Sequence, residues 1–93
     1  MNLQKLRKEI DEIDRQWMAL LSRRLKIAHQ IAIVKKKDKR PLSDAEREKA
    51  MLKEIRRWAQ EEGIDPKFAE TIFRQIIDYS IQEMQSAMEG KRL

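Results

Sequence analysis

The chain has 93 residues, of which 40% are charged, and its formal net charge at pH 7 is +5. A chain of this length forms one small domain, 1–93, near the lower size limit at which a single copy buries a sufficient core. Cysteine is absent, which excludes disulfide bonds and thiolate metal sites, and the positive charge favours an anionic partner without selecting nucleic acid, an acidic membrane surface or a small polycarboxylate.

The N-terminal segment, residues 1–16, is charged throughout and has no apolar stretch of the kind that forms the centre of a secretion signal. No run in the chain approaches the ~18 consecutive apolar residues of a membrane span. We therefore expect a cytoplasmic protein that does not enter a membrane.

The first predicted element is a long helix over about residues 3–36, a range without glycine or proline. Large apolar residues recur there in alternating steps of three and four, the spacing of one face of a helix. A helix of this length is ~50 Å long. We call this row the apolar seam, and one of its members is an arginine: Leu3, Leu6, Ile10, Ile13, Trp17, Leu20, Arg24, Ile27, Ile31 and Val34.

A turn and a second helix follow. Pro41 disfavours helix at the residue before it, so the first helix ends in the basic segment ahead of the proline. The pattern S-x-x-E, from Ser43 to Glu46, is typical of a capping box and predicts a second helix over about residues 44–62.

The third predicted helix runs over about residues 66–89. Gly63 provides a stop for the second helix, and Asp65 and Pro66 are suited to the N-cap and the first helical position of the third. The fold class is therefore all-α, with three helices and a very long first one.

The length of the first helix predicts a second copy of the chain. The later helices are only roughly 25–35 Å long and cannot cover both ends of a seam of ~50 Å. Leaving so much apolar surface in water is costly. We expect an intertwined homodimeric helical bundle.

Each predicted helix carries one polar residue on its apolar face: Arg24, Glu48 and Ser80. Glu48 lies near the start of its helix, where an acid is favoured in any case. Arg24 is different, because the seam continues apolar for about ten residues on either side and burying an unpaired guanidinium costs several kcal/mol. The seam contains no acidic residue to pair with it, so we expect a bound anion.

Lys35 is the second candidate for that anion. It lies eleven residues after Arg24, on nearly the same face of the helix and ~16 Å away along the axis, so the two side chains can hold one small molecule between them. Arg47 can join them from the start of the second helix. Lys35 also belongs to the basic run 35–40, and such runs are usually solvated.

The sequence offers no metal site. The single histidine, His29, lies off the apolar seam, where we expect an ordinary surface side chain. One histidine without cysteine does not bind zinc by itself. Neither a metal nor another cofactor is expected.

Five stretches of the chain, taken in order, match one family. The most specific are L-R-x-x-I-D-x-I-D and P-x-x-D-x-x-R-E, which are separated by the appropriate number of residues. Over about residues 3–88 the chain resembles the all-helical class of chorismate mutase, whose three-helix chains form an intertwined dimer. The matching stretches are LRKEIDEID, RRLKIA, VKK, RPLSDAEREKAML and FRQIIDYS.

The resemblance implies a dicarboxylate substrate, chorismate, and its pericyclic rearrangement to prephenate in aromatic amino-acid biosynthesis. It assigns carboxylate binding to Arg24 and to Arg7 from the other subunit, and it gives Lys35 the ether oxygen and a carboxylate. Arg7 and Arg24 are ~25 Å apart on one helix, too far to hold the same small molecule. Only a neighbouring antiparallel copy brings Arg7 into range.

Further residues follow from the same resemblance. Asp44, Arg47 and Glu48 line the site, and Glu48 holds the substrate hydroxyl. Ser80 contacts a carboxylate. The reaction needs no nucleophile, because holding the reactive conformer and placing cations at the developing oxyanion are sufficient.

One position departs from the family pattern. Four residues after the serine the family usually has a glutamine, sometimes a glutamate, that donates to the ether oxygen, and here that residue is Met84. Gln85 is adjacent but about 100° around the helix. Weak mutase activity carried by Lys35, rescue by another donor, and a related chemistry on the same scaffold are the three outcomes left open.

Three other functions stay open at this point. Isochorismate pyruvate-lyase uses the same fold, and the segment RRWAQEEGIDPKFAETIFRQII is similar to that branch. A non-catalytic, regulatory relative is the second. A basic helical protein that binds nucleic acid or a partner helix is the third, although acids are interleaved with the basic residues and no recognisable nucleic-acid-binding module is present.

Overall fold

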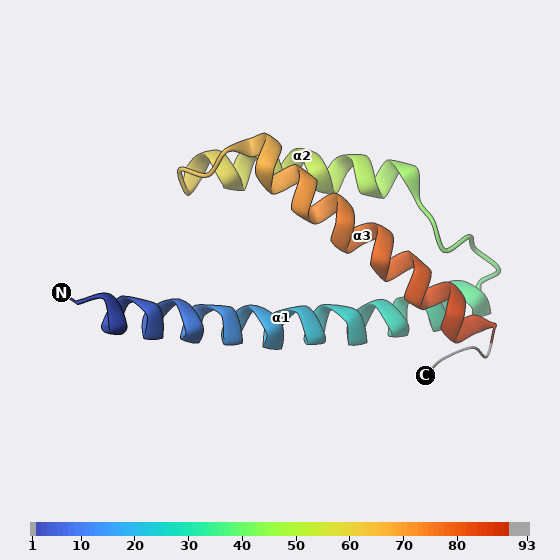
Figure 1. Ribbon diagram of the computed structural model, residues 1–93. Coiled ribbons are helices and arrows are strands. Elements are labelled where there is room, and N and C mark those ends of the chain that lie inside the picture. Colours follow the sequence, from blue (N-terminus) through green and yellow to red (C-terminus); the bar gives the residue numbers. More distant parts are fainter. Residues whose placement is uncertain (1, 90–93) are drawn as a thin grey trace.

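The computed structural model describes residues 2–89, and this range consists of three helices and their connections, without a strand. α1 spans Leu3–Lys37, α2 spans Ala45–Glu61 and α3 spans Pro66–Met88 (Figure 1). Each helix begins and ends within one residue of its predicted range, and the predicted all-α class is confirmed. No helix in the described range is both long and apolar enough to cross a membrane.

Local hydrogen bonds define both ends of α1. At its start, the Asn2 side chain accepts a bond of 2.9 Å from a backbone N–H of the first turn. At its end, Lys39 has a left-handed φ of 55°, and the backbone N–H of Arg40 bonds to the Lys35 carbonyl at 2.7 Å. This 6→1 bond closes the helix in a Schellman turn. α1 therefore ends before the proline that the sequence marked as its limit.

The capping of α2 differs from the prediction. Asp44, not Ser43, is the N-cap, and its Oδ1 accepts a bond of 3.0 Å from the backbone N–H of Arg47. A carboxylate caps a helix as well as a hydroxyl does and also gains from the helix dipole. The Ser43 hydroxyl is thereby released from capping and donates to Glu48 Oε2 at 3.2 Å.

The turn between α2 and α3 follows the predicted signals. Gly63 has a φ of 72°, a conformation that glycine adopts without a Cβ penalty. The N–H of Ile64 bonds back to the Ala59 carbonyl at 2.8 Å, which completes a second Schellman turn. Asp65 caps α3, and Pro66 is its first residue, as predicted.

α3 holds the chain together, because it packs against both α1 and α2 (Figure 1). Ile81 on α3 touches both of the small apolar clusters that form the core. The first cluster joins α1 to α3 and the second joins α2 to α3. Their buried members are Ala28, Ala32 and Met84 in the first cluster, and Leu52, Ile55 and Ile77 in the second.

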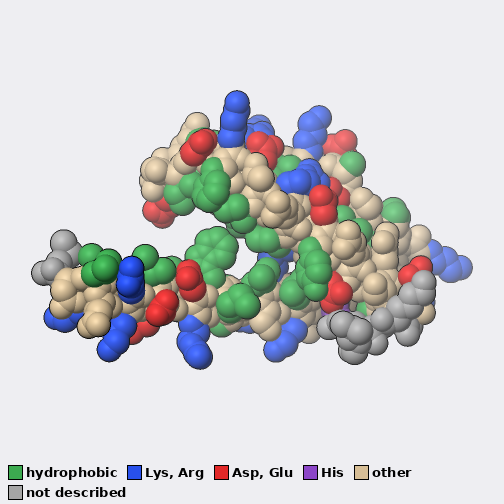
Figure 2. All heavy atoms as spheres, in the orientation of Figure 1, with side chains coloured by type: hydrophobic (Ala, Val, Ile, Leu, Met, Phe, Trp, Pro, Cys, Tyr) green, Lys and Arg blue, Asp and Glu red, His purple; other side chains and the backbone are tan. Residues whose placement is uncertain are grey.

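The N-terminal half of α1 has no packing partner among residues 2–89. Every residue from 3 to 20 is exposed, including Trp17 at 52%, and this part of the helix extends away from α2 and α3 (Figures 1 and 2). The molecule is accordingly elongated, with extents of 55 × 30 × 15 Å. In α1 only Ala28 and Ala32 are buried. The apolar seam thus lies beside the face that α1 uses for its own chain.

Candidate active site

The three helices line an open cavity of about 430 Å³ next to the loop between α1 and α2. A volume of this size suits a small-molecule ligand. Its apolar walls come from α1 and α3, chiefly Ile27, Ile31, Ile77 and Ile81. Seven of the eight predicted site residues line it: Arg24, Lys35, Asp44, Arg47, Glu48, Ser80 and Met84.

Arg24 reaches the cavity from the middle of α1 and has only neutral partners among residues 2–89. Its Nη1 donates to Ser80 Oγ at 3.1 Å and its Nη2 to Met51 Sδ at 3.6 Å. Burial lowers the pKa of Arg24 below its usual value, and the nearby charge of Arg47 lowers it further. Arg24 on α1 and Arg47 on α2 thus bring two cations to one cavity, and neither forms an ion pair among residues 2–89, an arrangement that favours a bound anion.

Ser80 is 5% exposed and is fully engaged within the chain. Its hydroxyl donates to the Ile76 carbonyl one turn earlier, at 2.8 Å, and accepts the bond from Arg24. The serine therefore positions the guanidinium. A direct hydrogen bond from Ser80 to a ligand carboxylate requires its hydroxyl to give up the Ile76 carbonyl.

Lys35 lies in the last turn of α1 and points to the loop that follows. Its Nζ donates to the Leu42 carbonyl at 2.9 Å. An ammonium group has three N–H donors, so two stay available for a ligand. Lys35 thus attaches the loop to the cavity wall and also presents a cation to the interior.

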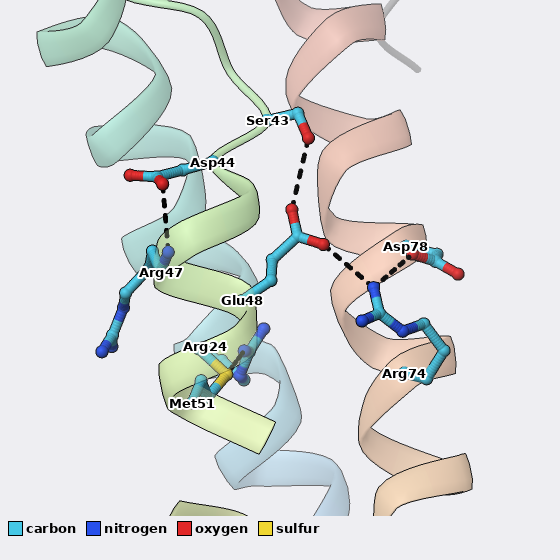
Figure 3. A network of polar contacts seen from close by, with 8 residues as sticks. All are labelled: Arg24, Ser43, Asp44, Arg47, Glu48, Met51, Arg74 and Asp78. Carbon is cyan, nitrogen blue, oxygen red and sulfur yellow. Dashed lines mark hydrogen bonds and ion pairs between the residues drawn. The ribbon is translucent and has the colours of Figure 1, made fainter. Parts of the chain in front are cut away.

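Glu48 projects from the first turn of α2 towards α3, and both of its carboxylate oxygens have partners (Figure 3). Oε2 accepts from the Ser43 hydroxyl, and Oε1 accepts from Arg74 Nη1 at 2.9 Å. Arg74 also reaches Asp78 Oδ1 at 3.5 Å. The hydrogen bond to Glu48 is the main reason that the pKa of Arg74 is raised.

Sequence reasoning missed Arg74. Its pair with Asp78 is an i, i+4 spacing that a sequence shows directly. Its pair with Glu48 joins two helices across 26 positions of the chain, and no sequence period reports such a contact. Met51 was also missed as a partner of Arg24, because a methionine on an apolar face is usually core.

Asp44 and Arg47 form the rim of the cavity at the start of α2. Asp44 is tied to the backbone of Arg47 by the N-cap bond, while the Arg47 side chain extends along α2, away from the aspartate (Figure 3). The carboxylate of Asp44 therefore leaves the Arg47 guanidinium unneutralised. Arg47 adds its charge to the cavity.

Met84 is the residue of its turn that faces the cavity. It is 6% exposed and packs on Ala28 and Ala32, whereas Gln85 is exposed and lies outside the cavity. The thioether cannot donate a hydrogen bond. A one-residue shift that would use the glutamine is thus excluded by the direction in which α3 presents these two side chains.

Two residues lie elsewhere. Arg7 is exposed on the N-terminal half of α1, outside the cavity. His29, expected at the surface, is instead half-buried, and its Nε2 has no hydrogen-bond partner within the described range. The reason is that His29 follows Ala28 on the side of α1 that turns towards α3. Residues 2–89 contain no group of three or more His, Asp or Glu side chains placed to hold a metal ion.

The family model of chorismate mutase type II matches residues 6–85. The chain is 33% identical to a chorismate mutase of Methanocaldococcus jannaschii over 78 residues, which are 84% of this chain and 79% of that protein. It is 38% identical to an isochorismate pyruvate lyase of Pseudomonas aeruginosa over 78 residues, which are 84% of this chain and 76% of the lyase.

Relatives of a third kind are much longer. A bifunctional chorismate mutase/prephenate dehydratase of Aquifex aeolicus is 40% identical over 78 residues, which cover 81% of this chain but only 22% of that protein. The mutase-type helical unit therefore occurs both by itself and as one part of larger enzymes. Match and geometry agree over all three helices, and the chain belongs to the chorismate mutase type II family.

Proposed function

We propose that this protein is a chorismate mutase, an isomerase that rearranges chorismate to prephenate in the cavity between its three helices. The observation that carries the proposal is Arg24, a half-buried guanidinium with neutral partners only, in a cavity that also contains Lys35 and Arg47. None of these three cations forms an ion pair among residues 2–89, and a dicarboxylate of low mass supplies the missing negative charge.

The reaction suits such a site because it needs no nucleophile and no proton transfer. The ether C–O bond breaks while a C–C bond forms, and negative charge builds on the ether oxygen in the transition state. Apolar walls and fixed cations hold the substrate in its compact, reactive conformer. A cation near the ether oxygen stabilises the developing charge more than it stabilises the ground state, which lowers the barrier.

The side chains divide these tasks. Arg24 binds one carboxylate, placed for it by Ser80, and Lys35 reaches the ether oxygen and a carboxylate. Glu48 accepts the hydrogen bond of the substrate hydroxyl. Asp44 and Arg47 complete the rim and exclude water.

Met84 limits the rate of this enzyme. With a thioether where the family has an amide, the ether oxygen receives a hydrogen bond from Lys35 and none from α3. By analogy with a lost oxyanion-hole donor, the missing hydrogen bond lowers the rate by a factor of about 10²–10³ relative to an enzyme that has this donor.

The functional unit is a homodimer in which two copies intertwine. The apolar seam supports this proposal, because in the single chain its members are exposed, for example Ile10 at 57% and Leu20 at 59%. A twofold axis that pairs two antiparallel α1 helices covers both seams at once. It also brings Arg7 of the partner subunit to the cavity, which supplies the second carboxylate clamp.

A hollow beside the cavity supports the same arrangement. It measures about 220 Å³, is almost wholly apolar, and opens between α1 and α3 at Trp17, Leu20 and Phe73. Apolar side chains of a second α1 fill it at the same time as they cover the seam. The enzyme acts in the cytoplasm on a free small molecule, without nucleic acid or membrane as a partner.

A chorismate-consumption assay on the purified chain tests the function. We expect prephenate to form, and we expect Arg24→Ala to reduce kcat/KM by at least 100-fold, as loss of a charged clamp does. Exchange of the exposed Arg23 for alanine is the matched control, because it removes the neighbouring charge without touching the cavity. Full activity in the Arg24 variant would refute the site.

A second candidate function has a specific observation in its favour. The lyase of Pseudomonas aeruginosa is as similar to this chain as the mutase relatives are, and elimination of pyruvate from isochorismate uses the same type of cavity. The assay is therefore run with isochorismate as well. Salicylate and pyruvate as the faster products would assign the chain to the lyase, and binding of a bicyclic transition-state analogue without turnover of either substrate would make it a regulatory relative.

A further inference from the structure

Glu48 is held by two neighbours that come from different parts of the chain. Arg74 on α3 donates to one carboxylate oxygen at 2.9 Å, and Ser43 in the loop before α2 donates to the other at 3.2 Å (Figure 3). The Glu48 side chain is 17% exposed, while that of Arg74 is 42% exposed. The carboxylate is thus fixed at the cavity wall by a cation whose own side chain is partly in water.

The two bonds leave Glu48 able to bind a ligand. An ionised carboxylate offers about four lone-pair sites, two on each oxygen. Ser43 and Arg74 occupy one on each oxygen, so each oxygen retains one. A substrate hydroxyl can therefore donate to Glu48 without displacing either neighbour.

Removal of Arg74 would leave this carboxylate with one neutral donor. A mostly buried carboxylate with a single neutral bond has more than one low-energy rotamer available and is poorly compensated for its loss of hydration. In the wild-type chain Glu48 is the stronger partner of Arg74, because its contact of 2.9 Å is shorter than the 3.5 Å contact with Asp78.

We propose that Arg74 is a positioning residue of this enzyme, which acts on the substrate through Glu48 by fixing its carboxylate for the substrate hydroxyl. The inference rests on the proposed function, in which Glu48 holds that hydroxyl. Arg74 does not line the cavity, so in this proposal it acts through Glu48 and not on the substrate directly.

The chain contains a matched control for this role. Arg56 on α2 forms an ion pair with Glu70 on α3 at 2.9 Å, and the two side chains are 44% and 36% exposed. This pair also joins α2 to α3, but neither of its members lines the cavity. Exchange of Arg56 therefore measures what an α2–α3 ion pair contributes to structure alone.

The experiment compares Arg74→Met, Arg74→Lys and Arg56→Met, each in the wild-type and in the Glu48→Gln background, with thermal unfolding as a check on folding. The substrate hydroxyl does not change during the reaction, so its hydrogen bond to Glu48 stabilises the ground state and the transition state equally. Weakening this hydrogen bond therefore raises KM more than it lowers kcat. We expect Arg74→Met to raise KM about fivefold, because the Glu48 carboxylate loses one of its two hydrogen bonds and the ion pair that is lost is partly exposed to water. Arg74→Lys should raise KM by only about half as much on a logarithmic scale, since an ammonium keeps the positive charge but lacks the planar donor geometry of the guanidinium.

The decisive result is the double variant. In the Glu48→Gln background we expect Arg74→Met to change KM by less than about twofold, because the carboxylate that it positions is gone. An equal effect of Arg74→Met in both backgrounds, or an effect no larger than that of Arg56→Met, would overturn the inference and leave the mutase function intact. If the wild-type chain neither converts nor binds the substrate or its bicyclic analogue, the proposed function fails, and the inference fails with it.

Discussion

The guanidinium of Arg24 on α1 lies 3.1 Å from the hydroxyl of Ser80 on α3, although the two residues are 56 positions apart in the chain. Ser80 in turn donates to the Ile76 carbonyl, so its hydroxyl cannot rotate freely. The arginine is therefore placed before any substrate enters. Such preorganisation matters because a long side chain loses rotamer entropy when a ligand has to order it.

Ser80→Ala tests this placement. We expect kcat/KM to fall about tenfold, because the Arg24 guanidinium loses its neutral anchor and must be ordered by the substrate. The fold should be retained, since alanine fits the buried position and removes no apolar packing. Steady-state kinetics and the midpoint of thermal unfolding measure the two effects.

Thr71 on the same helix is the control for this prediction. Its hydroxyl donates to the Lys67 carbonyl at 2.9 Å, the same backbone bond that Ser80 makes, at an exposed position far from the cavity. Thr71→Ala should leave kcat/KM unchanged. An equal loss of activity in both variants would mean that the bond to the helix backbone, and not the contact with Arg24, is what matters.

Met84→Gln should increase the rate and reduce the stability of the protein. The new amide can donate to the ether oxygen, which is worth up to about 10²–10³ in kcat. It also places a polar group against Ala28 and Ala32, where an amide without a partner costs about 1–3 kcal/mol in the absence of substrate. The measurements are prephenate formation and urea unfolding with and without a bicyclic inhibitor.

Met88→Gln is the comparison, because Met88 packs on the same cluster but does not line the cavity. It should lower the stability without an increase in rate. A Met84→Gln enzyme that is no faster than the wild type would show that Met84 is not a missing donor.

A mixture of two inactive variants should regain activity if Arg7 acts across the dimer. In a heterodimer of Arg7→Ala and Arg24→Ala chains, one of the two cavities combines an intact Arg24 with an intact Arg7 from the partner subunit. With random exchange about half of the dimers are mixed, so we expect about a quarter of the wild-type activity. The variants are mixed under conditions that dissociate the dimer, returned to buffer and assayed.

Two controls accompany this complementation. Each variant treated alone should stay inactive, and a mixture of Arg24→Ala with Lys35→Ala should gain nothing, because both of those residues serve the cavity of their own chain. No recovery in the first mixture would place Arg7 in its own subunit or outside the site. Recovery in the second mixture would mean that Arg24 and Lys35 do not serve the cavity of the same chain.

Lys39→Gly should stabilise the protein. Lys39 has a φ of 55°, which costs a residue with a Cβ about 1–2 kcal/mol relative to glycine. The greater entropy of glycine in the unfolded chain offsets part of that gain, so we expect a net increase of about 0.5–1 kcal/mol in the free energy of unfolding.

Chemical denaturation of Lys39→Gly and of Asp38→Gly checks the prediction. Asp38, the residue before Lys39, has a φ of −85°. Glycine therefore relieves no backbone strain at this position, and Asp38→Gly should lower the stability. Stabilisation by both exchanges, or by neither, would mean that the left-handed turn is not the source of the effect.

The limits of the helices could be predicted from the sequence to within one residue, because they depend on neighbours within four positions. The stop at Gly63 and the start at Asp65 and Pro66 are local conformational preferences that hold in any context. The start of α2 shows where such reasoning ends. Ser43 and Asp44 both cap helices well, and only the structure shows that Asp44 accepts the capping bond while the Ser43 hydroxyl donates to Glu48.

Seven of the residues that line the cavity were predicted from the sequence, since Arg24 stood out as a charge in an apolar row and the others followed from a family motif. What surrounds those residues was not. The ion pair of Glu48 with Arg74, the contact of Arg24 with Met51, and the burial of His29 depend on the relative rotation of packed helices.

The sequence by itself therefore determined three helices, their limits and an arginine within an apolar row, because helical period and capping are properties of short segments. Only the tertiary structure decided which face of α1 meets its own chain. The small residues Ala28 and Ala32 let α3 approach closely, while the larger members of the seam, such as Ile27 and Val34, stay half-exposed. Close approach of two helices depends on side-chain size at the contact, which periodicity does not report.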